Sequence, residues 1–166
     1  MATVYLGLGS NKAPDYHISW ALKALTKHFG DVACSPIYRS VAVGFDGDDF
    51  LNAVTCIQTD REVGEIKELM TVLEDQCGRD RSQPKFSDRV LDIDILLYDD
   101  KVGTFDGLSL PRDEITQYAH VLKPLADLAP TLCHPGTHQT YQMLWDTFTG
   151  DRAIYEHTLV SERPLP

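Results

Sequence analysis

Two carboxylates interrupt an otherwise apolar stretch in the middle of the chain. Residues 89–97 read RVLDIDILL, which is typical of a buried β-strand. Because side chains alternate between the faces of a strand, Asp92 and Asp94 are expected on one face and the apolar residues between them in a core. These expected core residues are Leu91, Ile93, Ile95 and Leu97. Two adjacent charges on such a strand are costly unless a cation neutralises them, and magnesium is the cation that carboxylates suit best here. A solvated strand face with two ordinary aspartates is the alternative.

A basic segment lies just before and beside this pair. Its cations fall within eleven positions and are Arg79, Arg81, Lys85 and Arg89. Cations beside a carboxylate-bound metal favour phosphoryl transfer, because the metal bridges phosphate oxygens and guanidinium groups neutralise charge in the transition state. The alternative is a solvated charged loop. The loop 79–88 is long and polar, which predicts a lid over a substrate with Phe86 near its tip.

Three further side chains suit a flat heterocycle or a nucleotide. Asn52 offers a hydrogen-bond donor and an acceptor together, and Phe50 can stack on a ring. Glu74 lies one helical turn before Gly78 and can pair with an arginine. Taken alone, each has an ordinary explanation as a turn asparagine, a core phenylalanine or a solvated glutamate. Ser10-Asn11 is interpreted as a strand-terminating turn, because no Walker A sequence is present.

The composition is that of an ordinary globular protein. The chain has 166 residues, 43% of them hydrophobic and 24% charged, and we expect one domain over residues 1–166 with no fused second domain. The formal net charge of −10 argues against a nucleic-acid partner, which needs a basic surface. A monomer is expected.

Cysteine spacing and hydropathy indicate the compartment. None of the four cysteines forms a C-x-x-C pair or has zinc-ligand spacing, so we expect reduced thiols in a cytoplasmic protein. No run of 18 apolar residues and no signal peptide is seen, so no contact with a membrane is expected.

Periodicity and breakers predict a ferredoxin-like α+β sandwich. The expected strands cover 3–9, 32–42, 51–59 and 89–98, and the expected helices cover 16–29, with Asp15 as N-cap, and 62–77. The resulting β-α-β-β-α-β order should place both helices on one face of an antiparallel sheet.

The remainder is expected to extend that core with a hairpin and short helices. The hairpin covers 102–110, and helices cover 113–122, 124–129 and 139–148, with Pro124 and Pro130 as breaks between segments. The tail from Arg163 is expected to fray.

Taken in order, these segments resemble the 6-hydroxymethyl-7,8-dihydropterin pyrophosphokinase family of folate biosynthesis. The resemblance covers about residues 3–130, and the Asp-bearing strand is its most specific element. The matching segments are LGSN at 8–11, YRS at 38–40, DFLNAV at 49–54, Glu74 with GRDR at 78–81, RVLDIDILLY at 89–98, LP at 110–111 and LKPL at 122–125.

The resemblance implies a reaction and a site. Such enzymes transfer pyrophosphate from MgATP to the hydroxymethyl group of a reduced pterin, releasing AMP. Asp92 and Asp94 would hold two magnesium ions and would be catalytic together with Arg79 and Arg89. The pterin would lie against Ser40, Val43, Phe50, Asn52 and His120. The nucleotide would lie against Glu74, Arg81, Lys85, Phe86, Ile95, Arg112 and Tyr118.

The match fails after Leu110-Pro111. Arg112, Tyr118 and His120 stand where the family usually has a histidine, an arginine and a phenylalanine. This departure leaves two alternatives open. One is a catalytically weakened paralogue that binds nucleotide and pterin. The other is the same chemistry on a different reduced pterin.

Overall fold

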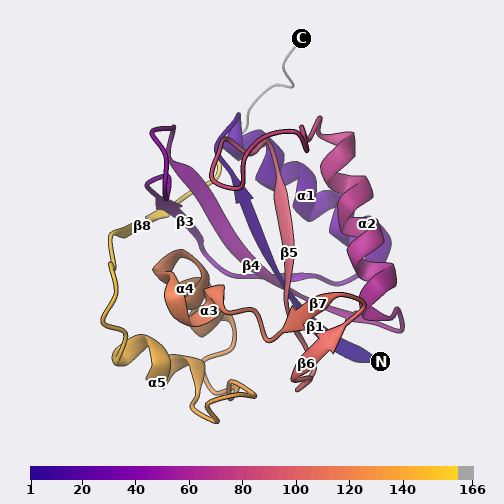
Figure 1. Cartoon of the computed structure of the whole chain (residues 1–166), viewed down its shortest axis with the longest axis vertical. Coiled ribbons are helices and arrows are strands. Elements are labelled where there is room, and N and C mark those ends of the chain that lie inside the picture. The colour runs from indigo at the N-terminus through magenta and orange to yellow at the C-terminus, as the bar shows by residue number, and fades with distance from the viewer. Residues whose placement is uncertain (161–166) are drawn as a thin grey trace.

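The structure is a computed structural model that describes residues 1–160 (Figure 1). Its order of strands and helices confirms the predicted β-α-β-β-α-β core. The elements are β1 (Ala2–Ser10), α1 (Pro14–Phe29), β2 (Ala33–Cys34), β3 (Ile37–Ser40), β4 (Phe50–Thr59), α2 (Val63–Gln76), β5 (Asp92–Tyr98), β6 (Gly103–Phe105), β7 (Leu108–Leu110), α3 (Glu114–Gln117), α4 (Ala119–Leu128), α5 (Tyr141–Asp146) and β8 (Ile154–His157).

The main sheet has the strand order β5-β1-β4-β3-β8, with β2 also paired to β4. All of its pairings are antiparallel. In this register Gly9 of β1 lies between Asp92 of β5 and Asn52 of β4, and Gly7 lies between Asp94 and Val54. The sheet therefore brings the two acidic residues and the asparagine to one end of three neighbouring strands.

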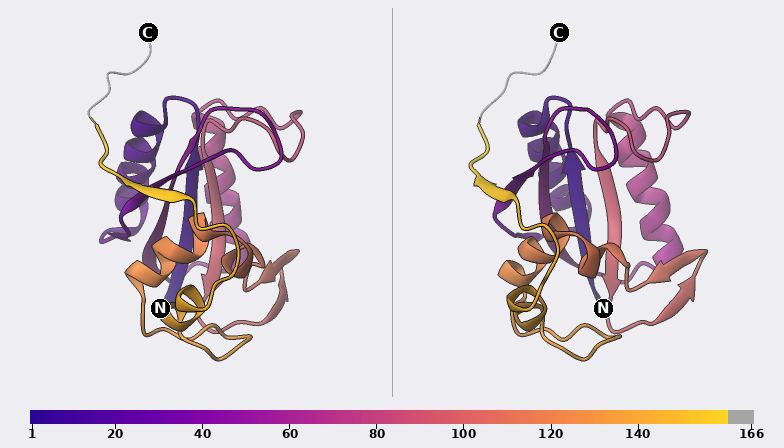
Figure 2. Two further views of the ribbon diagram at one scale, coloured as in Figure 1. Left: turned by 90° about the vertical axis from the view of Figure 1, so that its left-hand side faces the viewer. Right: turned by 60° about the vertical axis from the view of Figure 1, so that its left-hand side comes forward.

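The larger core lies between the sheet and the two long helices. Alternate residues of β1, among them Val4 and Leu6, pack with Ile18 of α1 and Ile66 of α2 in one buried cluster. Both helices therefore cover the same face, as predicted, and the views of Figure 2 show them on one side of the sheet. The apolar stripes that predicted these helices are the residues that this face buries.

A second, smaller core covers part of the opposite face. Val54 and Leu96 pack there against Ile115 of α3, Leu122 of α4 and Tyr141 of α5. These short helices cover only the half of the sheet that lies away from Asp92, and the other half stays open as a cavity.

The prediction that Leu97 shares a core with Ile93 and Ile95 is wrong, because β5 contains a β-bulge. The pairing of β5 with β1 shifts by one residue between Tyr5 and Leu6, which leaves Leu96 without a partner. Leu97 consequently joins the second core instead of the core of Ile93 and Ile95. Strict alternation holds for Asp92 and Asp94, which lie before the bulge.

The N-cap of α1 and the strand expected over 32–42 also differ from prediction. Asp15 is not the N-cap of α1: Ala13 occupies that position with a φ of 42°, and Asp15 lies inside the first turn. The expected strand over 32–42 is divided at Ser35-Pro36 into β2 and β3.

The C-terminal part departs most from prediction. Pro124 lies inside α4 and does not end a helix; the break falls at Tyr118, whose backbone is extended. Packing of Leu122 and Leu125 against the sheet offsets the hydrogen bond that the proline lacks.

The remaining C-terminal elements agree with prediction only in part. The hairpin is confirmed as β6 and β7, α5 is shorter than expected, and β8 was not predicted. The tail from Arg163 lies outside the described residues. None of the helices described is both long and apolar enough to span a bilayer.

Candidate active site

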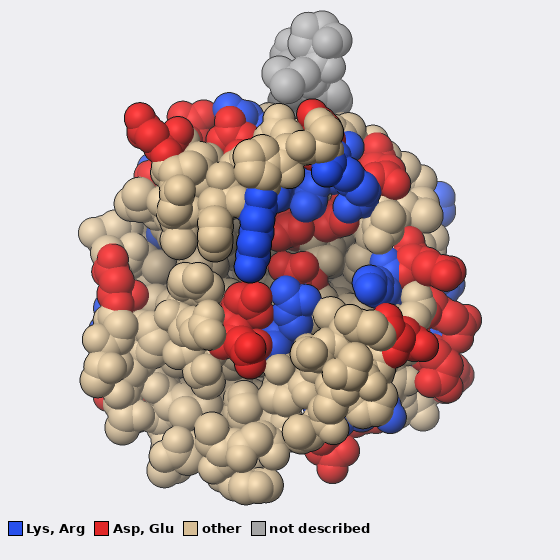
Figure 3. All heavy atoms as spheres, in the orientation of Figure 1, with Lys and Arg blue, Asp and Glu red and all other residues tan. Residues whose placement is uncertain are grey.

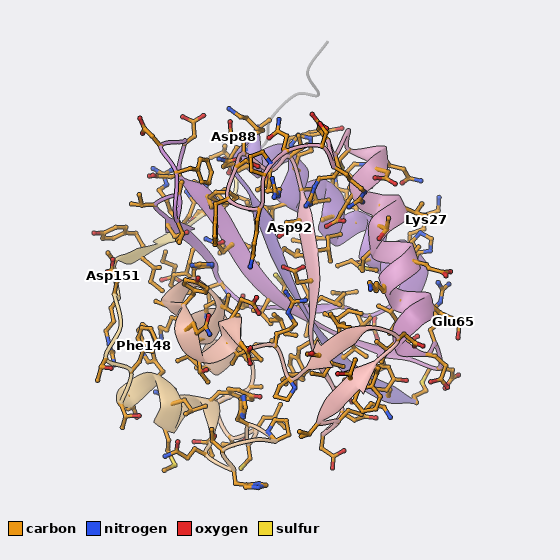
Figure 4. All side chains as sticks on the ribbon, viewed as in Figure 1. Lys27, Glu65, Asp88, Asp92, Phe148 and Asp151 are labelled. Carbon is orange, nitrogen blue, oxygen red and sulfur yellow. The ribbon has the colours of Figure 1, made fainter. Side chains whose placement is uncertain are left out.

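A cavity of about 410 Å³ opens on the half of the sheet that α3 to α5 leave uncovered. Its walls come from β1, β4 and β5, from the loops after β3 and before β5, and from the 112–121 segment. Figure 3 shows acidic and basic side chains gathered around a hollow in the middle of this face. Figure 4 places Asp92 on β5 beside it and Asp88 on the loop above.

Two glycines form the floor of the cavity. Gly7 and Gly9 face it from β1, while their neighbours Leu6 and Leu8 point into the larger core. A Cβ atom built on Gly9 would lie 3.8 Å from Oδ1 of Asn52, so the fold has room for it but the cavity floor would rise. The missing side chains keep an open trough between the acidic pair on β5 and Asn52 on β4.

The two carboxylates share one wall of this trough. Burial, and then the charge of Asp92, raises the pKa of Asp94 to about 7. Nη1 of Arg79 donates to Oδ1 of Asp92 at 3.0 Å. Residues 1–160 hold no group of three or more acidic, histidine or cysteine side chains that could bind a metal. A hard cation here would take carboxylate oxygens from this pair and its other ligands from phosphate or water, as magnesium in nucleotide sites does.

Glu74 acts behind the cavity wall instead of lining it. The residue is 6% exposed, and its carboxylate accepts the main-chain N–H of Ile93 at 2.9 Å and contacts Nη1 of Arg79 at 3.4 Å. Burial raises the pKa of Glu74, although the bond from Ile93 opposes this shift. Glu74 therefore fixes Arg79 and the beginning of β5. Arg81 pairs with Glu74 and Asp75 outside the cavity.

The loop before β5 is folded around Arg89. The guanidinium donates to the carbonyl oxygens of Lys85 at 2.7 Å and Pro84 at 3.0 Å, and to the hydroxyl of Ser87. Phe86 packs on Gly44, where an added Cβ would lie 3.1 Å from its ring. The loop before β5 thus touches the loop after β3 across the cavity mouth.

Asn11 joins these two loops to the end of β1. Its Nδ2 donates to the carbonyl oxygen of Asp48 at 3.2 Å and to Oδ1 of Asp88 at 2.8 Å, and its Oδ1 accepts the N–H of Arg89 at 2.8 Å. Asn11 is 2% exposed. The sequence predicts only a strand-terminating turn at Asn11, within the LGSN segment that matches the family.

The opposite wall suits a flat ring with hydrogen-bond donors. Nδ2 of Asn52 donates to the carbonyl oxygen of Tyr38 at 3.2 Å and to Oγ of Ser40 at 2.8 Å, which leaves Oδ1 as an acceptor toward the trough. Phe50 lies nearby, and His120 stacks on Tyr118 with ring centroids 5.2 Å apart. Burial lowers the pKa of His120 to about 4, so its ring is neutral near pH 7.

Comparison with known proteins identifies the family. A sequence model of the 7,8-dihydro-6-hydroxymethylpterin-pyrophosphokinase family matches residues 5–130. The chain belongs to this family. Its membership confirms the resemblance seen in the sequence and the predicted class of enzyme, a pyrophosphokinase.

Two bacterial relatives named 2-amino-4-hydroxy-6-hydroxymethyldihydropteridine pyrophosphokinase illustrate the similarity. The protein of Aquifex aeolicus is 37% identical over 139 residues, covering 81% of this chain and 85% of the relative. That of Pseudomonas aeruginosa is 36% identical over 140 residues, covering 81% and 86%.

The solved structure of wild-type HPPK-DHPS from Plasmodium falciparum shares the fold. It superposes with a TM-score of 0.68 at 13% identity, over 89% of this chain and 44% of that one. This chain therefore spans less than half of that protein. At this identity the likeness supports the ferredoxin-like fold alone.

The cavity gathers most of the site residues predicted from the sequence. Those that line it are Ser40, Val43, Phe50, Asn52, Arg79, Lys85, Phe86, Arg89, Asp92, Asp94, Arg112, Tyr118 and His120. Glu74 and Arg81 lie behind its wall. Ile95 does not line the cavity: the residue is 3% exposed and packs in the core on the other face of the sheet, so its contact with the nucleotide stays a prediction. The prediction missed Gly7, Gly9, Phe45, Glu114 and Gln117 among the lining residues.

Proposed function

We propose that the chain transfers pyrophosphate from MgATP to the hydroxymethyl group of 6-hydroxymethyl-7,8-dihydropterin, releasing AMP, as a step of folate biosynthesis. Family membership supports this reaction. One structural observation carries the assignment to this cavity: the acidic pair on β5 and the acceptor oxygen of Asn52 on β4 face each other across the glycine floor of β1.

The phosphate end of the reaction belongs to the β5 side. Two magnesium ions held by Asp92 and Asp94 would neutralise the triphosphate and orient it. Arg79 and Arg112 add fixed positive charge beside the acidic pair. Arg89 and Lys85 reach the cavity from the loop before β5, and the guanidinium of Arg89 must release loop carbonyls before it can contact phosphate.

The pterin belongs to the β4 side. A pterin carries N–H donors on the edge of its ring, and Oδ1 of Asn52 is the acceptor that matches them. Phe50 and His120 supply rings for stacking, and Ser40 with Val43 closes the edge of the pocket. Bound there, the pterin would present its hydroxymethyl group toward the acidic pair.

Positioning and charge neutralisation then account for catalysis. The hydroxyl oxygen forms a bond to the β-phosphorus, the bond from that phosphorus to the α,β-bridging oxygen breaks, and AMP leaves with the oxygen while the hydroxyl proton passes to solvent. Because no covalent intermediate with the protein is required, the residues only hold both substrates in line and stabilise the charge that develops.

The remaining properties are proposed with this function. One catalytic domain over residues 1–166 acts as a monomer in the cytoplasm on two small molecules. The acidic net charge, −10, supports the absence of a nucleic-acid partner, and the free cysteines among the described residues suit a reducing compartment.

The test is AMP formation with purified protein. AMP should appear only when ATP, magnesium and the reduced pterin are all present. Asp92→Asn and Asp94→Asn should each lower kcat on the order of 10³-fold and leave the fold intact, because each removes one carboxylate charge that a triphosphate-bound cation needs. Asp100→Asn, in the exposed turn after the same strand, is the matched control and should be unaffected.

Two results would contradict this assignment. Wild-type protein that binds both ligands and forms no AMP would favour the weakened paralogue. A pterin with another substituent that reacts much faster would move the assignment to a different acceptor.

A further inference from the structure

Glu114 presents a conflict that the proposed function does not resolve. The cationic residues that line the cavity are Arg79, Lys85, Arg89 and Arg112, and the acidic residues are Asp92, Asp94 and Glu114. A cation bound by Asp92 and Asp94 explains that pair. A third carboxylate would repel a triphosphate across the same space, so its presence needs a compensating contact.

The compensating contact is with Arg112. Nε of Arg112 donates to Oε2 of Glu114 at 3.1 Å, and Nη2 donates to Oε1 at 3.2 Å. Two parallel bonds fix the plane of the guanidinium as well as its position. The main chain of Arg112 is also anchored, since its N–H donates to the carbonyl oxygen of Leu96 at 3.1 Å.

Arg112 is therefore held along one edge, and its other edge remains available. Within residues 1–160, neither a hydrogen bond from Nη1 of Arg112 nor an ion pair of Arg112 with any acid other than Glu114 is found. Arg112 and Asp94 both line the cavity, so the free edge of the guanidinium shares this space with the carboxylate of Asp94. Glu114 is the acid of the cavity that holds this guanidinium.

We infer that Glu114 is a positioning residue that holds Arg112 away from Asp94 with the free edge of its guanidinium directed to the bound nucleotide. Without Glu114, the guanidinium of Arg112 would be free to turn toward another acid of the cavity, and a salt bridge with Asp94 would both occupy a proposed metal ligand and remove a phosphate contact. This inference rests on the proposed function, because it assumes that the cavity binds MgATP.

A double-mutant cycle tests it in the full-length protein. The dissociation constant of a non-hydrolysable ATP analogue with magnesium is measured by calorimetry for wild type, Glu114→Ala, Arg112→Ala and the double variant. We expect Glu114→Ala to weaken binding about tenfold in the wild-type background and not to weaken it further once Arg112 is alanine. Glu114→Gln, which keeps one acceptor oxygen but loses the charge, should give a smaller loss.

Controls separate positioning from general damage. Asp113 is the neighbouring residue and is exposed. Asp113→Ala removes the same charge as Glu114→Ala and should leave nucleotide binding unchanged. Pterin affinity should be unaltered in Glu114→Ala, whereas a damaged fold would weaken both ligands.

Tighter nucleotide binding by Glu114→Ala would overturn the inference. So would losses of nucleotide affinity from the two single substitutions that multiply in the double variant, or a wild-type protein that binds no nucleotide. Absence of AMP formation by wild type would instead overturn the proposed function, and the cycle would still decide the role of Glu114.

Discussion

A neutral histidine lines the cavity at the place where a flat ring is proposed to stack. His120 packs on Tyr118 at an interplanar angle of 24°, and burial brings its pKa to about 4. A neutral imidazole has one N–H donor and one acceptor nitrogen on its edge. The ring therefore combines a stacking face with a polar edge, which a phenylalanine would not supply.

We predict that His120→Phe changes selectivity more than catalysis. The affinity for 6-hydroxymethyl-7,8-dihydropterin should stay within about fivefold, since stacking is kept, and discrimination in favour of pterins with further hydroxyl groups should fall. Competing pterins in one AMP-release assay measure this ratio. In wild type, pterin affinity should not vary between pH 6 and 8 through His120, because protonation occurs only near pH 4. Equal discrimination by both proteins would contradict the prediction.

Among single residues, the sequence predicted those that take part in the reaction better than those that hold other residues in place. Asp92 and Asp94 were found because two charges in an apolar strand violate a local rule. Asn11 and Glu114 violate no such local rule. Their roles depend on contacts with residues that the order of the sequence does not reveal. Asn11, for example, bonds to residues 37 and 77 positions away.

Among the elements, β1 determines the shape of the site. Its alternate positions bury Leu6 and Leu8 on one face and leave Gly7 and Gly9 on the other, under the cavity. The alternation was predictable from the strand pattern. That the glycines would form a floor was not, because this depends on the order of β5, β1 and β4 in the sheet. The bulge at Leu96 was likewise invisible, since both sides of it read as apolar strand.

Gly9→Ala should separate binding from folding. Its Cβ would meet only ordinary contacts, at 3.8 Å from Asn52 and 3.9 Å from Phe50, so stability should be unchanged or higher by about 0.5–1 kcal/mol. The added methyl group raises the floor beside Oδ1 of Asn52, so pterin affinity should fall about tenfold or more. Nucleotide affinity serves as the internal control and should change little. A loss of both affinities, or of neither, would contradict the prediction that the glycine floor of β1 makes room for the pterin.

The two loops at the cavity mouth allow a matched comparison between a buried and an exposed contact. Asn11 and Lys12 both contact Asp48 and Asp88, but Asn11 is buried whereas Lys12 makes exposed ion pairs of 3.5 and 3.2 Å. Asn11→Ala should cost about 2 kcal/mol of stability and speed hydrogen exchange at the Arg89 amide. Lys12→Ala should do neither, because exposed ion pairs contribute little. Equal effects of the two substitutions would show that charge, and not the buried amide, holds the loops.

In the whole molecule, the C-terminal segment closes the sheet on the side away from β5. Strand β8 pairs with β3, and the segment is attached to α1 through Asp15, whose Oδ1 accepts the N–H of Val160 and contacts Nε2 of His157, both at 2.8 Å. This segment lies beyond the residues that match the family, 5–130. The sequence did not predict β8, because a four-residue edge strand with half its residues exposed has no distinct pattern.

The contact of Asp15 predicts a specific dependence of stability on pH. Burial alone would raise the pKa of Asp15, but the hydrogen bonds from His157 and Val160 outweigh it and lower the pKa below its usual 3.8. The unfolded chain therefore takes up the proton first on acidification. The stabilisation is complete above pH 4 and is lost as the pH falls through the folded value. Asp15→Asn should lower the free energy of unfolding by about 2 kcal/mol at pH 5 to 7, and the difference from wild type should shrink below pH 4.

Urea unfolding at a series of pH values measures this difference, with Asp31→Asn as the control at an exposed aspartate near the other end of α1. The control should follow wild type at every pH, because Asp31 makes no side-chain contact among the hydrogen bonds and ion pairs of residues 1–160. Since β8 extends the sheet edge next to the strand that carries Ser40, the same substitution should also increase hydrogen exchange in β8 before it affects β1 or β5. A difference that persists unchanged to pH 3 would mean that Asp15 stabilises the chain by packing and not through its charge.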